Sequence, residues 1–290
     1  MRISDLHGRG RPVFSFEFFP PKTDEGASNL MATVADLGQA LKPDFVSVTN
    51  GAMGATRTRT LEIVSRIQAD LGITAMAHLT CVGSSAEQVR DEVRRLCGRG
   101  IENILALRGD APADADGGGF EVAAGGFAHA TDLIEFLAAN FDVDLGGACY
   151  PETHPEAPSP DDDLRWAKRK LELGARFLVT QLFFDNDAYF DFVARARAAG
   201  IAAPITPGIM PITNVAQIER FTKMCGATIP EELYERLRRD QDDPAKVMAT
   251  GIEHAIRQCR GLLAGGAPGL HFYTLNKSHA TRSILAAVQA

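Results

Sequence analysis

The sequence predicts an α/β fold of the (β/α)8 TIM-barrel class, formed as one domain by residues 1–290. Eight short runs rich in β-branched and aromatic residues alternate along the chain with longer segments of helical periodicity. No break in composition is long enough to be a linker, and both the chain length and the number of strand–helix units match a closed barrel. An open doubly wound sheet with an extra lobe is the alternative that this pattern leaves open.

The predicted strands are short and apolar, and they occupy residues 13–18, 44–50, 73–80, 102–108, 143–149, 176–183, 204–209 and 270–275. The predicted helices lie between and after them, near residues 27–41, 57–71, 85–99, 131–140, 161–174, 187–199, 214–224, 244–264 and 277–288. Two of these helices carry clear start signals. Ser159 is a candidate N-cap before Pro160 and three acids, and Ser84 or Ser85 precedes another acidic first turn.

Composition limits the class of partner. The net charge of −7 argues against nucleic acid, because nucleic-acid-binding proteins need a basic surface. No apolar run approaches the roughly 20 residues that span a bilayer, and the charged N-terminus MRISDLHGRGRP lacks the apolar core of a secretory signal. The five cysteines are scattered without a CxxC pair, as in reduced cytosolic proteins. We therefore expect a cytoplasmic protein with no membrane or nucleic-acid partner.

Polar residues follow seven of the eight predicted strands. Each alone has an ordinary structural explanation; His78 could be a hydrogen-bonded core residue and Asp110 could form an Asx turn. In a barrel, however, functional residues gather at the C-terminal ends of the strands. Together these residues predict one polar pocket, and they are Glu17, Thr49, Asn50, Gly51, His78, Leu79, Thr80, Arg108, Gly109, Asp110, Tyr150, Pro151, Glu152, Thr153, His154, Thr180, Gln181, Tyr273, Thr274, Leu275, Asn276 and Lys277.

The glycine-rich segment 112–129 falls between a predicted strand and a predicted helix. Its glycines lack the spacing of a dinucleotide-binding turn. The segment is therefore interpreted as a mobile loop beside the active site.

The segments SFEFFPPK, VSVTNGA, AHLTC, LALRGD, CYPETHPEA, TQLFFD, PGIMP and HFYTLNK follow one another in this order. This ordered set resembles the 5,10-methylenetetrahydrofolate reductase family from Val13 to about Lys277, and the chain is similar to the short bacterial form, without a regulatory extension. The resemblance implies a barrel with non-covalent FAD and no metal, and a homo-oligomer. It also implies reduction of 5,10-methylenetetrahydrofolate to 5-methyltetrahydrofolate by NADH or NADPH through FAD, which supplies methyl groups for methionine synthesis.

The stretch VFSFEFFPPK places Glu17 beside Phe16, Phe18 and Phe19. The resemblance implies that Glu17 is the general acid that protonates nitrogen 10 of the folate as its ring opens. Aromatic surroundings disfavour the charged form of a carboxyl group, so we expect the pKa of Glu17 to be raised. A raised pKa would let Glu17 donate a proton near neutral pH.

The resemblance implies roles for other residues. Asp110 corresponds to a second catalytic carboxylate that would stabilise the cationic iminium and lie beside both flavin and folate. The residues implied in folate or nicotinamide binding are Asp110, Gln181, Gln217, Phe221 and Lys277. The residues implied in FAD binding are Thr49, Asn50, Ala52, His78, Arg108, Gly109, Asp110, His129, Ala130, Tyr150, His154, Ala157, Asp163, Trp166, Arg169 and Lys170. Three cations in this set could bind the diphosphate, namely Arg108, Arg169 and Lys170.

Three of these positions depart from the familiar bacterial pattern. Asn50 and His129 stand where that pattern has tyrosine, and Trp166 stands where it has asparagine. A rearranged hold on FAD is one explanation and neutral drift is the other.

Two other functions also stay open: another flavin-dependent barrel oxidoreductase of the proline dehydrogenase kind, or a folate- or flavin-binding barrel without turnover.

Overall fold

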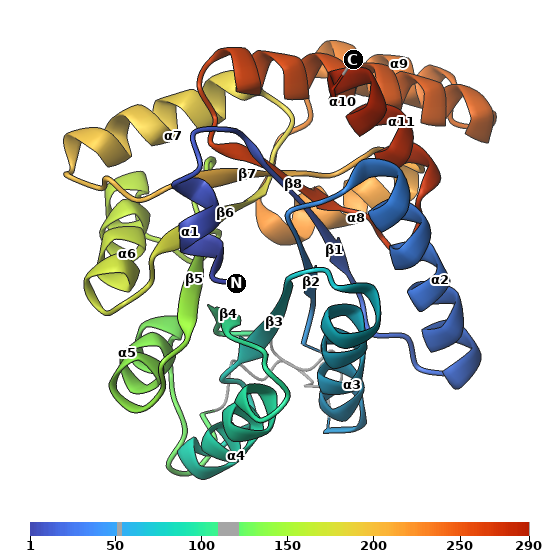
Figure 1. Cartoon of the computed structure of the whole chain (residues 1–290). Helices are drawn as coiled ribbons and strands as arrows, with labels where there is room; N and C mark the ends of the chain where they lie inside the picture. Colours follow the sequence, from blue (N-terminus) through green and yellow to red (C-terminus); the bar gives the residue numbers. More distant parts are fainter. Residues whose placement is uncertain (51–53, 110–121, 290) are drawn as a thin grey trace.

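The computed structural model describes residues 1–50, 54–109 and 122–289. Eight parallel strands form a closed barrel in the order β1 to β8, with helices outside it (Figure 1). The strands are β1 (Val13–Phe18), β2 (Phe45–Val48), β3 (Ala75–Thr80), β4 (Asn103–Leu107), β5 (Asp144–Cys149), β6 (Phe177–Leu182), β7 (Ile205–Ile209) and β8 (Gly269–Tyr273). The (β/α)8 prediction is confirmed, and closure of β8 onto β1 excludes the open-sheet alternative.

The helices are α1 (Ile3–His7), α2 (Asp24–Leu41), α3 (Gly54–Leu71), α4 (Ala86–Cys97), α5 (Ala130–Asn140), α6 (Pro160–Glu172), α7 (Asn186–Ala198), α8 (Val215–Cys225), α9 (Glu231–Arg239), α10 (Pro244–Ala264) and α11 (His279–Gln289). The predicted start of α6 is confirmed, because the Ser159 side chain accepts a hydrogen bond from the Asp162 amide. For α4 the cap is Ser85, which forms a capping box with Gln88. None of the described helices is long and apolar enough to cross a membrane.

The sequence did not predict α1, which closes the N-terminal end of the barrel. The Ile3 amide donates to Asn103 Oδ1 at 3.0 Å, and the Ser4 amide donates to Asp144 Oδ2 at 2.8 Å. Ile3 and Leu6 are buried in one apolar cluster with Val13, Phe45 and Phe177, which are the first residues of their strands. In Figure 1 the N-terminus lies within the ring of strands. With this end filled, the opposite mouth of the barrel is left for the site.

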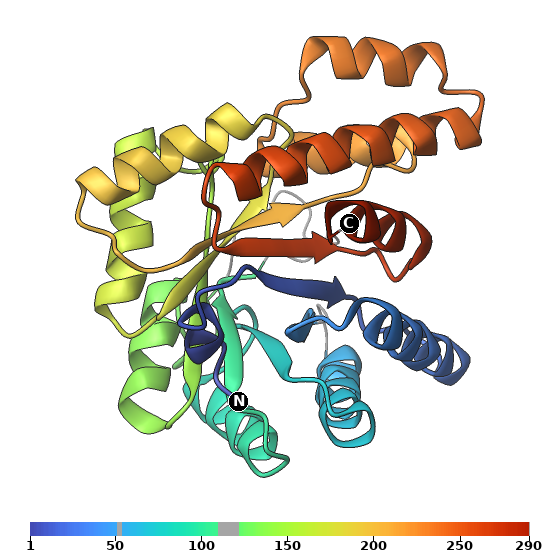
Figure 2. The ribbon, with the colours of Figure 1, turned by 45° about the horizontal axis from the view of Figure 1, so that its top comes forward.

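A second unpredicted helix, α9, lies on the outer side of α10 (Figure 2). Acids occupy its first turn and arginines its last, as the helix dipole favours. Only Leu233 and Leu237 are buried on this short helix, so its apolar repeat is brief. This brevity explains why the pattern gave no helix here.

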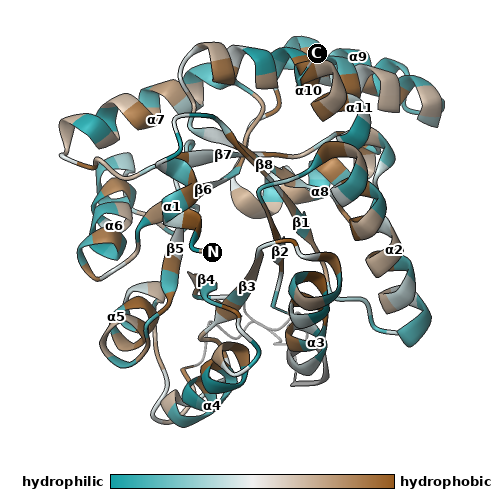
Figure 3. Cartoon of the chain, viewed as in Figure 1, coloured by the Kyte–Doolittle hydropathy of each residue, from teal (hydrophilic) through white to brown (hydrophobic). Residues whose placement is uncertain are grey.

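The side chains of β1 point alternately into two layers, the one between strands and helices and the one inside the barrel. Phe16 and Phe18 are buried in the apolar layer between strands and helices, whereas Ser15 and Glu17 face the barrel interior, where both contact His271. Figure 3 shows hydrophobic strands surrounded by helices with hydrophilic outer faces. Burying one such phenylalanine stabilises the fold by roughly 1.5–3 kcal/mol. The phenylalanines beside Glu17 in sequence therefore hold β1 in place and do not surround the carboxyl group.

Candidate active site

A buried carboxylate and two histidines lie together inside the barrel, on the side of its C-terminal mouth. Glu17 on β1 is 6% exposed, and its Oε2 lies 3.2 Å from His271 Nε2 on β8. His78 Nε2 on β3 lies 3.3 Å from the same oxygen, at ion-pair distance but without hydrogen-bond geometry. Three separate strands thus direct their side chains to one point on the barrel axis.

The pKa of Glu17 differs from the sequence-based expectation. Burial alone would raise the pKa of this carboxyl group, but His78 and His271 outweigh burial and lower it to about 2. The expected raised pKa is therefore wrong. The alternation of side chains along β1 turns Phe16 and Phe18 away from the barrel interior, and two imidazoles lie beside Glu17 instead, so its ionised form is favoured.

Ser15 fixes the orientation of His271. Its Oγ lies 2.7 Å from His271 Nδ1, while Nε2 of the same ring faces Glu17. The imidazole thus links a hydroxyl and a carboxylate in a buried row. Sequence reasoning assigned no role to Ser15 or His271, although both alternate with outward apolar residues in the strands that flank the barrel closure. Their positions in the alternating pattern of β1 and β8, where every second side chain points into the barrel, could have identified them from the sequence.

Tyr273 bounds the site above His271. Its hydroxyl donates to the Thr180 carbonyl oxygen at 2.6 Å. Burial, together with the nearby charge of Glu17, raises the pKa of Tyr273 well above its ordinary value, so the phenol stays neutral. A Cβ at Gly208 would lie 2.5 Å from the same carbonyl oxygen and 2.6 Å from the tyrosine hydroxyl. Glycine at this position therefore leaves room for the tyrosine.

Four of the five residues expected to bind folate are among the described residues, and they lie at the C-terminal mouth on several elements. Gln181 is on β6, where its Oε1 accepts from the Leu182 amide at 2.8 Å. Gln217 and Phe221 follow one another by about one turn of α8, and Phe221 packs against the apolar cluster beside β6 and β7. Lys277 is exposed beyond β8. The structure brings these residues to one end of the barrel but shows no contact between them.

Four of the residues expected to bind FAD form a connected group beside β5 and α6. The rings of Tyr150 and His154 meet edge-to-face with centroids 4.6 Å apart. The His154 amide donates to Asp163 Oδ2 at 3.0 Å, and the Ala157 amide donates to the His154 carbonyl oxygen at 2.8 Å. Burial raises the pKa of Asp163 and lowers that of His154. These hydrogen bonds fix the loop between β5 and α6.

The three cations expected at a diphosphate have other contacts in this structure. Arg108 forms a two-pronged ion pair with Glu156, at 2.5 and 2.7 Å. Arg169 contacts Glu172 at 3.3 Å on the surface of α6. Lys170 Nζ donates to the Ala148 carbonyl oxygen at 2.7 Å, and burial lowers its pKa. An anion beside Arg108 must therefore share or displace Glu156.

Two of the positions that depart from the bacterial pattern contact each other. The rings of His129 and Trp166 are stacked, with centroids 6.1 Å apart and planes 25° apart. Both side chains are exposed, and Trp166 keeps 46% of its surface accessible. Ala130, which begins α5, follows His129 directly. The pair presents a flat aromatic surface between the start of α5 and the middle of α6.

Other expected cofactor contacts lie nearer β2 and β3. Asn50 Nδ2 donates to Thr80 Oγ1 at 3.2 Å, and its Oδ1 is a buried acceptor without a partner. The Thr49 amide donates to the Phe18 carbonyl oxygen at 2.9 Å. Gly109 has a φ of +89°, and a Cβ there would lie 2.6 Å from Val82.

Three expected residues cannot be placed. Gly51, Ala52 and Asp110 lie outside the described residues, as does most of the glycine-rich segment 112–129. The roles expected for them stay predictions.

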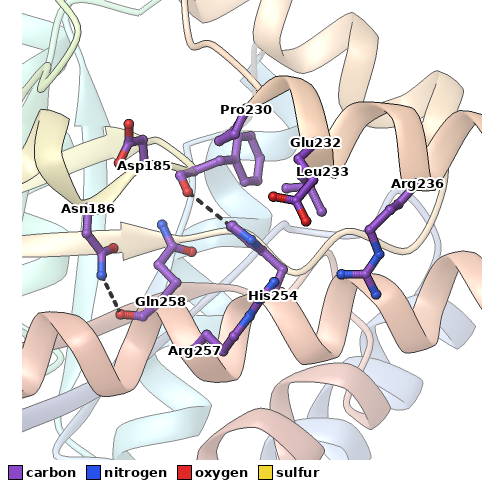
Figure 4. Close-up of a pocket in the computed structure, with 10 residues that line it drawn as sticks. Asp185, Asn186, Pro230, Glu232, Leu233, Arg236, His254, Arg257 and Gln258 are labelled. Carbon is purple, nitrogen blue, oxygen red and sulfur yellow. Dashed lines mark hydrogen bonds between the residues drawn. The ribbon is translucent and has the colours of Figure 1, made fainter.

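A cavity of about 400 Å³ lies elsewhere, between the β6–α7 connection and helices α9 and α10 (Figure 4). It contains none of the expected site residues. Two of its polar groups have partners in the fold: Arg236 pairs with Glu253 at 2.7 Å, and His254 Nε2 lies 3.0 Å from the Phe184 carbonyl oxygen. We therefore take the barrel mouth, where the buried carboxylate lies, as the candidate active site.

Comparisons with known proteins agree with the ordered motifs. The methylenetetrahydrofolate reductase family profile matches residues 2–289. The chain is similar to a protein of Oryza sativa subsp. japonica named probable methylenetetrahydrofolate reductase (NADH), with 40% identity covering 98% of this chain and 49% of that protein. It is also similar to 5,10-methylenetetrahydrofolate reductase of Escherichia coli strain K12, with 37% identity covering 95% of this chain and 90% of that protein. The chain thus spans about half the length of its plant relatives.

Among solved structures, a Clostridium thermocellum protein described as binding two copies of 5-methyl-5,6,7,8-tetrahydrofolic acid has a TM-score of 0.63. It is 20% identical and covers 100% of this chain and 98% of its own, so it supports the fold alone. The family profile spans nearly the whole chain and the Escherichia coli protein is 37% identical, which confirms the resemblance; the chain belongs to the methylenetetrahydrofolate reductase family.

Proposed function

We propose that this protein reduces 5,10-methylenetetrahydrofolate to 5-methyltetrahydrofolate with electrons from a reduced nicotinamide, passed through non-covalent FAD. Family membership supports the reaction, and the buried cluster of Glu17, His78 and His271 is the observation that carries it. Opening the imidazolidine ring requires a proton at nitrogen 10 of the folate. The cluster places a buried carboxyl group beside two imidazoles, and groups of these types can pass a proton to a substrate.

Glu17 can act as the acid although its pKa is low without substrate. His271 Nε2 lies 3.2 Å from Glu17 Oε2, so a proton that reaches this imidazole can pass to the carboxylate in one short transfer and leave a neutral acid beside a neutral imidazole. Substrate covering the mouth excludes water, and loss of water favours the neutral arrangement. Glu17 then donates to nitrogen 10. Ser15 holds His271 in register for this transfer.

The described residues fit a bound FAD. The stacked rings of His129 and Trp166 offer an exposed flat surface, and Asn50 Oδ1 is a buried acceptor without a partner. Arg108 supplies positive charge at the end of β4. When bound, FAD supplies the hydride chemistry that no side chain can provide. Asp110 is proposed to stabilise the iminium cation, on the strength of the sequence resemblance.

One experiment separates this function from the alternatives. The purified protein is mixed anaerobically with NADH or NADPH, and then with methylenetetrahydrofolate or, in a parallel sample, with the imine product of proline oxidation. Flavin absorbance should bleach with a nicotinamide and recover only with the folate. Recovery with the imine would instead indicate a proline dehydrogenase-like enzyme, and bound flavin that never bleaches would indicate a binding protein. The same spectra determine which nicotinamide is the donor.

We also propose a cytoplasmic location and a homo-oligomer. All five cysteines are free, which suits a reducing compartment. The oligomer is proposed from the family resemblance, and the mass of the purified protein by light scattering tests it.

A further inference from the structure

The hollow beside α9 and α10 has the lining of a small-molecule site. Its volume of about 400 Å³ lies within the roughly 300–1,000 Å³ that is usual for ligand pockets. Phe184, Pro230 and Leu233 form an apolar part of the lining, and both Phe184 and Leu233 are almost fully buried. Charged side chains from α9 and α10 form another part (Figure 4). The hollow therefore offers apolar surface and charge to the same occupant.

The two helices carry their charges in a matched register. The short connection 240–243 reverses the chain between α9 and α10, which lie side by side (Figure 2). Arg236 on α9 pairs with Glu253 on α10 at 2.7 Å. Glu232 lies four residues before Arg236, and Arg257 lies four residues after Glu253. Because residues four apart share one face of a helix, Glu232 and Arg257 are the next opposite charges along this antiparallel pair.

This second set of charges does not form an ion pair as the first one does. In the part of the chain that the structure describes, neither Glu232 nor Arg257 has a hydrogen bond or an ion pair. Both side chains are exposed and both line the hollow. A ligand that brings an ammonium group to Glu232 and a carboxylate to Arg257 would complete the row of charges with charge-assisted hydrogen bonds.

Two further lining residues favour a ligand with both charges over a simple anion. Asp185 adds a second carboxylate, although it also caps α7 by accepting from the Asp187 amide at 3.0 Å. His254 Nε2 lies 3.0 Å from the Phe184 carbonyl oxygen, which can only accept, so Nε2 carries a proton and Nδ1 is an acceptor in the neutral ring. Burial lowers the pKa of His254, which favours that neutral ring. An anion would thus meet two carboxylates, whereas a zwitterion balances the charges of the lining.

We propose that the hollow binds a free α-amino acid with an apolar side chain. Its ammonium group pairs with Glu232, its carboxylate pairs with Arg257, and its side chain packs against Phe184 and Leu233. An α-amino acid bears both charged groups on one carbon, which suits a gap between two facing side chains. The site is separate from the barrel mouth, so the inference does not depend on the proposed function.

Ligand analogues test which groups are recognised. Binding of valine, leucine, isoleucine, methionine and phenylalanine to the FAD-loaded wild type is measured by ligand-observed NMR titration. At least one should bind with a dissociation constant below about 1 mM. For the tightest of them, the matched acid without the ammonium group and the matched amine without the carboxylate are then titrated; for leucine these are 4-methylpentanoate and 3-methylbutylamine. Each analogue should bind at least about tenfold more weakly, because it loses one charge-assisted contact. Glycine, which lacks the apolar side chain, should also bind at least about tenfold more weakly.

Two neutralising substitutions locate the ligand. Glu232→Gln and Arg257→Gln each remove one charge from an exposed side chain, so each should leave the fold intact and weaken the tightest ligand at least about tenfold. Glu235→Gln is the matched acidic control, because Glu235 is an exposed residue of α9 that does not line the hollow. Arg95→Gln, at an exposed arginine of α4, is the basic control. Both controls should bind the ligand within about twofold of wild type.

The outcomes are distinct. The inference is overturned if none of the five amino acids binds below about 1 mM, or if an analogue or either variant in the hollow shows a smaller loss than expected. Displacement of the amino acid by 5-methyltetrahydrofolate would place the ligand at the barrel mouth and would also overturn the inference. None of these results bears on folate reduction, which the flavin spectra test separately. If a variant does not fold, the analogue series on the wild type gives the decision.

Discussion

Glu17 Oε2 lies 3.2 Å from His271 Nε2, and Nδ1 of the same imidazole lies 2.7 Å from Ser15 Oγ. This row of three buried side chains joins β1 to β8 across the seam that closes the barrel. The carboxylate therefore has an imidazole fixed on one side, and the closure of the barrel sets its position. The arrangement accounts for an acid whose pKa is low before substrate binds.

Replacing Glu17 with glutamine tests its role as the acid. Glu17→Gln keeps the size of the side chain but removes the proton, so FAD binding and oxidation of the nicotinamide should persist. Folate reduction should slow by about 10²–10⁴-fold, the usual contribution of general acid catalysis. Stopped-flow measurement of each half-reaction separates the two effects. A wild-type rate of folate reduction in this variant would remove Glu17 from the mechanism.

The low pKa of Glu17 also predicts how stability depends on pH. Because the folded-state pKa of about 2 lies below the ordinary 4.5, the ionised carboxylate stabilises the fold above pH 4.5, and this stabilisation is lost as the pH falls toward 2. The difference in unfolding free energy between wild type and Glu17→Gln should shrink by about 2 kcal/mol between about pH 5 and about pH 3. Urea unfolding at both pH values measures it. A difference that does not change with pH contradicts the low pKa.

The barrel could be predicted because strand and helix periodicity repeat throughout the chain. All eight strands lie where the alternation of apolar runs placed them, within about two residues, the usual uncertainty of such boundaries. The two missed helices lacked that signal. Helix α1 is only five residues long and is held by side chains from β4 and β5, contacts that no local pattern reveals.

The sequence predicted which residues lie together at the barrel mouth better than it predicted their electrostatics. The rule that functional residues follow barrel strands grouped Glu17 with His78, and the two side chains lie 3.3 Å apart. Their roles stay predictions. The same reasoning took sequence neighbours for spatial neighbours, and so surrounded Glu17 with phenylalanines. Its actual partner, His271, is 254 residues away in sequence. Only closure of β8 onto β1 brings the two together.

Asp110 provides a prediction that rests on the sequence resemblance alone. Asp110→Asn would remove a negative charge beside the flavin, so the reduction potential of bound FAD should rise. Folate reduction should slow as well, because the cationic iminium loses a stabilising charge. Spectroscopic redox titration measures the potential. An unchanged potential would place Asp110 away from the redox-active ring.

The stacked pair of His129 and Trp166 predicts an altered hold on FAD. Trp166→Asn removes an aromatic face whose stacking is worth roughly 0.5–1.5 kcal/mol, so the dissociation constant of FAD should rise by about three- to tenfold. Fluorescence titration of the apoprotein with FAD measures this directly. The companion variant Asn50→Tyr should also change FAD affinity, because it removes the hydrogen bond that Asn50 Nδ2 donates to Thr80. If both variants stay within twofold of wild type, the departures at these positions are neutral.

The central claim is that one flavin in this barrel accepts electrons from a nicotinamide and passes them to methylenetetrahydrofolate with a proton from Glu17. The most direct measurement is the anaerobic absorbance spectrum of the FAD-loaded wild type and Glu17→Gln, first with NADH or NADPH and then with the folate. In the wild type, the flavin should bleach and then recover as 5-methyltetrahydrofolate forms. In Glu17→Gln it should bleach normally and stay bleached over the time in which the wild type recovers. Equally fast recovery in both proteins, or a wild-type flavin that no nicotinamide bleaches, would contradict the account.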